Sequence, residues 1–175
     1  TMADDKRQKT DQLTLTSPVS LFGLVAGKFL AAFLIFLIGA AIMLVYAVGL
    51  AAAVANSETG AVFNWAGFFG NFIGIILMGS VFISAGILIS SLTENQMIAA
   101  IGSIGVNILL CLFDIISNFV TVPILKNIIN ALSVLYKYQE FTYGIFSLKN
   151  ILFFLSLIAV FNFLTMRVIE RRRWS

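Results

Sequence analysis

Four long stretches without a charged residue constrain the fold of this chain more than any other feature. They cover residues 29–55, 61–92, 97–113 and 151–166. The first would form a helix about 40 Å long, enough to cross a hydrocarbon core of about 30 Å, and the others approach or exceed one crossing. Because backbone polar groups must be satisfied internally in lipid, this pattern predicts an all-α integral membrane protein with four transmembrane helices.

Composition supports this class. Hydrophobic residues make up 60% of the 175-residue chain and charged residues 11%, whereas a soluble domain has about half and about a quarter. We expect one transmembrane domain over residues 1–175, because no polar stretch reaches the roughly 50 residues of a small soluble domain. Histidine is absent and Cys111 lies in an apolar run, so we predict no cofactor and disfavour a metalloprotease or a His-dependent hydrolase.

Residues 115–150 differ from the four runs because charged side chains are scattered among apolar ones. The segment predicts one or two short amphipathic helices at the membrane surface or packed over the bundle. Lys and Arg flank the first and last spans and are missing from both short loops, which favours cytoplasmic placement of both chain ends. The 115–150 segment would then be extracytoplasmic. The flanking basic residues are Lys6, Arg7, Lys9, Lys28, Arg167, Arg171, Arg172 and Arg173.

Small residues recur through the second run at roughly helical spacing. The most regular are Gly70, Gly74, Ser80 and Ser84. Helix association in lipid depends on close van der Waals fit, so these positions predict helix packing, and the same pattern would also suit a sliding interface that lines a path.

Uncharged polar side chains also lie inside the runs, and we expect them to form interhelical hydrogen bonds rather than to bind substrate. They are Asn71, Ser103, Asn107 and Asn162. The interiors of the four runs contain no carboxylate or base, since Asp114 follows the third run. A proton relay therefore has no residues to use.

Residues 1–20 form the largest polar stretch expected in the cytoplasm and end near Pro18, which should break any helix before the first span. This segment is the expected docking surface for a partner. Gly23 to Lys28 resembles a phosphate-binding loop but lacks its first glycine and its Ser or Thr after the lysine. Energy would therefore come from another subunit. The net charge of +3 reflects the span flanks and predicts no nucleic-acid partner.

The segment before the first span resembles the coupling element of ABC-2 type exporter permeases, a family that includes multidrug, polysaccharide and gliding-motility-associated permeases. That element has an acidic pair, basic residues, Gly-Thr, Leu-Leu and Pro-Val. Lys9 stands at the glycine position here and Thr14 splits the leucine pair. The stretches 86–96 and 167–174 resemble the family's loop and tail. The matching residues are Asp4, Asp5, Lys6, Arg7, Thr10, Leu13, Leu15, Pro18 and Val19.

The resemblance implies a permease subunit in the bacterial plasma membrane that works with an ABC ATP-binding subunit and with a second permease copy or a paralogue. The coupling residues would contact the ATP-binding subunit. Family members have six spans, so this chain, which begins with Thr1, would correspond to the C-terminal two-thirds of one. The alternative is a non-transporting membrane scaffold or mechanical transmitter, since a shared fold does not establish transport. We do not expect an enzyme.

Overall fold

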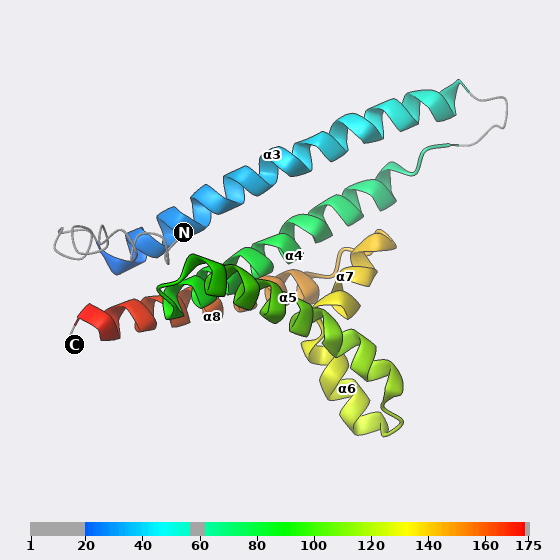
Figure 1. The fold of residues 1–175 in the computed structure, drawn as a ribbon. Helices are drawn as coiled ribbons and strands as arrows, with labels where there is room; N and C mark the ends of the chain where they lie inside the picture. The colour runs from blue at the N-terminus through cyan, green and yellow to red at the C-terminus, as the bar shows by residue number, and fades with distance from the viewer. Residues whose placement is uncertain (1–19, 57–61, 174–175) are drawn as a thin grey trace.

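The computed structural model describes residues 20–56 and 62–173 (Figure 1). All regular secondary structure in this part of the chain is helical, and four of the helices are long and apolar enough to cross a membrane. The predicted all-α membrane fold with four spans is confirmed. The helices are α3 (Leu21–Ala55), α4 (Trp65–Leu92), α5 (Gln96–Phe119), α6 (Pro123–Leu132), α7 (Val134–Thr142) and α8 (Leu148–Arg173).

The first span begins earlier than predicted. Instead of starting at residue 29, α3 is one continuous helix of 35 residues from Leu21 to Ala55, about 50 Å long. Ser20 caps it, because its side chain accepts a hydrogen bond of 3.1 Å from the backbone N–H of Gly23. Gly27 does not interrupt the helix, since one interior glycine costs only about 1 kcal/mol relative to alanine.

The third and fourth spans extend beyond their uncharged runs. α5 continues to Phe119 with Asp114 inside it, and α8 continues through Arg167 to Arg173. A charge ends an apolar run without ending a helix, because Arg and Glu are good helix formers. Arg167 and Glu170 also form an ion pair of 2.7 Å one turn apart. The second span starts at Trp65, after Asn64 caps α4 by accepting from Gly67 N–H at 3.0 Å.

The segment from 115 to 150 contains two short helices, with Ser133 alone between them. Pro123 opens α6, where its missing N–H has no cost, and Ser133 caps α7 through Tyr136 N–H. α7 does not lie free on a surface. Its Val134 and Phe141 are fully buried.

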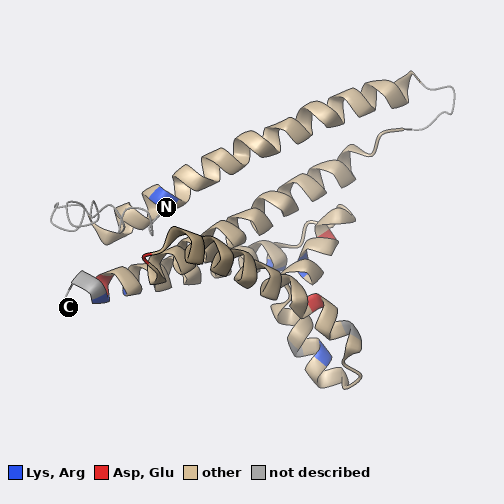
Figure 2. Cartoon of the chain, in the orientation of Figure 1, with Lys and Arg blue, Asp and Glu red and all other residues tan. Residues whose placement is uncertain are grey.

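α4 occupies the centre of the bundle and packs against α3, α5, α7 and α8. The main core joins α4, α7 and α8. A second, smaller cluster joins α3 to α8 through Val25 and Ile169. The start of α3 and the end of α8 lie at the same end of the bundle, while α5 and α6 diverge from it as a hairpin (Figure 1). Charged residues lie near helix ends and on α6 and α7 (Figure 2).

Candidate functional site

The predicted coupling residues lie outside the described part of the chain. They are Asp4, Asp5, Lys6, Arg7, Thr10, Leu13, Leu15 and Pro18. Their assignment therefore stays a prediction, and the site described here is built from the helices that follow them.

Two glycines of α4 form the seat for α7. A Cβ atom added at Gly70 would overlap the backbone carbonyl oxygen of Phe141, and one added at Gly74 would lie 2.9 Å from Phe141 Cβ. Gly144, which follows α7 with a φ of 74°, would lie 3.0 Å from the added atom at Gly70. No larger residue fits at either α4 position without moving α7.

Side-chain hydrogen bonds connect α7 to α4 on one side and to α8 on the other. The hydroxyl of Tyr138 donates to Asn71 Oδ1 on α4. Asn150 at the start of α8 is buried and donates from Nδ2 to Glu140 Oε2 at 2.5 Å. Lys137 is also buried, with its ammonium 5.5 Å from the ring centre of Phe153. α7 is therefore held by contacts to both α4 and α8.

The buried position of Lys137 was not predicted, although packing of the 115–150 segment over the bundle was one of the two expected arrangements. One signal could have indicated it. Val134, Lys137 and Phe141 recur at helical spacing on one face of α7, and all three are buried.

Serine side chains of α4 line its contact with α8. Ser80 and Ser84 donate to carbonyl groups one turn earlier in α4, at 2.7 and 2.8 Å. Ser84 also accepts a bond of 3.3 Å from Asn162 Nδ2 on α8. The α4–α5 contact is similar, since Ser103 donates to Gly86 O at 3.3 Å.

Three of the four predicted polar groups, Asn71, Ser103 and Asn162, thus bond across helices as expected. Asn107 differs because its Oδ1 is buried without a hydrogen-bond partner in the described structure. Asn162 Oδ1 is buried in the same way, although Asn162 Nδ2 is bonded.

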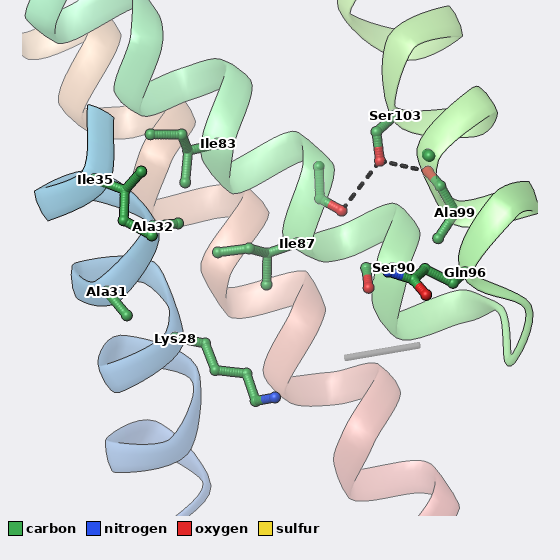
Figure 3. A pocket seen from close by; sticks show the side chains of 12 residues that line it. Lys28, Ala31, Ala32, Ile35, Ile83, Ile87, Ser90, Gln96, Ala99 and Ser103 are labelled. Carbon is green, nitrogen blue, oxygen red and sulfur yellow. Dashed lines mark hydrogen bonds between the residues drawn. The ribbon is translucent and has the colours of Figure 1, made fainter. Parts of the chain in front are cut away.

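Two grooves flank the first half of α3. One, of about 540 Å³, lies between α3, α4 and α5, with Lys28 and Ile87 among its lining residues (Figure 3). The other, of about 470 Å³, lies between α3 and α8, lined by Phe22, Phe29, Asn162 and others. The sequence indicated Lys28 only as a basic residue flanking the first span, and the structure places its side chain along a groove.

The groups that line the two grooves are suited to binding. Among the described residues, no group of three or more His, Cys, Asp or Glu side chains could hold a metal ion. The groove walls combine apolar side chains with a few hydroxyl, amide and ammonium groups. Such walls can hold an amphiphilic molecule beside α3.

A family model described as "ABC-2 family transporter protein" matches residues 1–174. No curated protein and no solved structure matches the chain.

Proposed function

We infer the function from the premise that this chain belongs to the ABC-2 family of transporter proteins. It is a multi-pass membrane permease of the ABC exporter type, with four helices able to span the membrane. Members of this family generally work with an ATP-binding subunit. We propose that this chain is the permease subunit that exports a substrate using ATP hydrolysed by that separate subunit.

The observation that carries the proposal is the extent of the family match, which includes residues 1–20 as well as all the spans. In the proposal this segment contacts the ATP-binding subunit. Leu13 and Leu15 provide the apolar contact, and the charged residues from Asp4 to Arg7 provide electrostatic complementarity.

The geometry of α3 supports a route by which movement of the ATP-binding subunit would be passed to the spans. The helix begins immediately after the coupling segment and runs without a break to Ala55. Only Val25, Ala40 and Ala47 are buried along it. A displacement of residues 1–20 would therefore be transmitted to α3, a stiff helix with few buried residues. α3 would then move relative to α4, α7 and α8, which stay packed together.

The proposed complex contains two ATP-binding subunits and a second permease, either a copy of this chain or a paralogue. It resides in the bacterial plasma membrane with residues 1–20 and the end of α8 in the cytoplasm, so that α6 and α7 lie on the extracytoplasmic side. Labelling tests the orientation. In a Cys111→Ala background, Val62→Cys should react with a membrane-impermeant maleimide on intact cells. Ser20→Cys should react only after permeabilisation, and the reverse pattern would contradict the proposed topology.

The decisive experiment replaces both leucines of the coupling segment in the full protein. The Leu13→Asp, Leu15→Asp double variant should insert normally but lose most of the co-purifying ATP-binding subunit. Substrate-dependent ATP hydrolysis should fall at least tenfold, because a charge in an apolar protein contact is strongly unfavourable. Thr16→Asp is the matched control, since it adds a charge to the same segment at a position outside the predicted contact.

Unchanged ATP hydrolysis in the double variant would contradict the assigned coupling residues. Purification of the wild-type protein without any ATPase, under conditions in which another ABC exporter stays assembled, would favour the scaffold function instead.

A further inference from the structure

The groove between α3, α4 and α5 has one strongly polar end and apolar walls. Lys28 extends from α3 on one side, and Ser90 and Gln96 lie on the opposite side (Figure 3). Ile35 and Ile87 line the groove beside them. With a volume of about 540 Å³, it falls within the range of about 300–1,000 Å³ typical of small-molecule sites.

The electrostatics of this end favour an anion. Among the described residues that line the groove, Lys28 is the one that carries a charge. Gln96 is the first residue of α5, so the partial positive charge of that helix terminus adds to the field of the ammonium group. Ser90 and Gln96 supply side-chain groups that can donate hydrogen bonds.

The depth of the polar end matches the boundary between lipid headgroups and acyl chains. Lys28 lies seven residues after Leu21, about 10 Å along α3. Gln96 follows the turn between α4 and α5. A lysine at such a depth normally directs its ammonium group toward the headgroups while its methylenes contact apolar atoms.

The apolar part of the groove faces the lipid side of the bundle. Ile35 on α3 is 72% exposed, as is Met97 in the first turn of α5. The α3 side of the groove has only small side chains at Ala31 and Ala32, which leave space beside the isoleucines. A chain of methylenes can therefore enter the groove sideways from the bilayer.

We propose that this groove binds one anionic phospholipid of the leaflet in which α3 begins. Its phosphate lies between the Lys28 ammonium group and the side chains of Ser90 and Gln96, and an acyl chain runs between Ile35 and Ile87. The bound lipid bridges α3 to α4 and α5 and fixes the position of α3. This site holds whether or not the chain couples to an ATP-binding subunit.

Lipid retention tests the site on the full protein with its native partners. The complex is reconstituted in vesicles of equal phosphatidylglycerol and phosphatidylcholine, extracted in mild detergent and examined by native mass spectrometry. Wild-type protein should retain at least one phosphatidylglycerol and should enrich it at least fivefold over phosphatidylcholine. Lys28→Gln should remove most of this enrichment, and Lys28→Arg should keep it.

Two further variants separate binding from folding. Ala32→Phe keeps the lysine but fills the groove, so it should also lose the lipid. Lys126→Gln removes an exposed lysine of α6, outside the groove, and should retain phosphatidylglycerol at the wild-type level. Unchanged melting temperatures show that each variant is folded.

A phosphatidylglycerol carrying a photoreactive acyl chain then locates the bound molecule. Cross-links to Ile35 or Ile87 are expected. Three results would overturn the proposal. The wild-type protein could retain both lipids equally, or Lys28→Gln and Ala32→Phe could leave the enrichment unchanged. The third is a cross-link showing that a helix of another subunit occupies the groove.

Discussion

α3 and α4 are adjacent, comparably apolar helices, yet the bundle holds them very differently. α3 buries only Val25, Ala40 and Ala47 among its 35 residues. α4 has 28 residues and buries Gly70, Gly74, Ser80, Val81, Ser84, Ala85, Ser90 and Ser91. Both helices also contain several glycines.

The difference lies in what surrounds the small residues. An added Cβ at Gly27, Gly39 or Gly49 of α3 would meet nothing within 4 Å, whereas at Gly70 and Gly74 it would strike α7. A small residue permits close approach but does not by itself bring a partner. In this molecule the partner of Gly70 and Gly74 is α7, a short helix held in place by side-chain hydrogen bonds. We therefore infer a fixed part made of α4, α7 and α8, and a movable part, α3, which buries fewer of its residues.

The largest expected difference between the fixed part and α3 concerns phenylalanine contacts. Phe154 is fully buried in the core shared by α4, α7 and α8, so Phe154→Ala should lower the free energy of unfolding by about 3 kcal/mol. Phe36 on α3 is only half-buried, and its ring covers Gly79. Phe36→Ala should cost only about 1 kcal/mol, because lipid replaces part of the lost contact.

Unfolding by SDS in mixed micelles measures both phenylalanine variants on the full chain. Equal losses would mean that α3 is packed as firmly as α8, and the distinction between a fixed and a movable part would fail.

A pair of glycine substitutions compares the two helix faces directly. Gly70→Ala should destabilise the protein by about 1–3 kcal/mol, because the new methyl group forces α7 away from α4. Gly49→Ala makes the same chemical change in open space and should leave stability unchanged or raise it by up to about 1 kcal/mol. Thermal unfolding in detergent, monitored by size-exclusion chromatography, distinguishes the two. A similar loss for both would show that contact with α7 does not set the cost, since alanine is the better helix former at either position.

The smallest effect concerns the hydrogen bond between α4 and α8. Ser84→Ala removes the bond to Asn162 Nδ2 and should cost about 0.6 kcal/mol, the average for such bonds in membrane helices. Ser156→Ala is the control, because its exposed hydroxyl bonds only to Phe153 O of its own helix. SDS unfolding curves of the two variants should differ by this small free energy. Coinciding curves would mean that the bond adds nothing to the stability of the fixed part.

Much of the fold follows from the sequence because the bilayer leaves few alternatives. Uncharged runs fixed the number of spans, and the predicted interhelical bonds of Asn71, Ser103 and Asn162 were found. The helix ends differed from those predicted, because a charged residue ends an uncharged run without ending a helix. Arg167 favours helix and Asp114 is tolerated in one.

The buried seat of α7 was not predictable in the same way. The spacing of Val134, Lys137 and Phe141 could indicate a buried face of α7. It does not identify the partner of that face, because Phe153 from α8 contacts Lys137 only after the chain has folded back. The groove beside Lys28 likewise arises from three separate helices. Such features depend on tertiary arrangement, which local residue patterns do not specify.

The α7 seat also bears on how this protein can change through evolution. Any side chain at position 70 collides with the main-chain oxygen of Phe141, and no compensating side-chain replacement elsewhere can remove a backbone atom. Related sequences that keep this arrangement should therefore retain glycine at position 70, while positions 27, 39, 49 and 105, where the space is open, should drift freely. Divergence in this lineage should accumulate along α3 and leave the α4–α7 contact nearly unchanged.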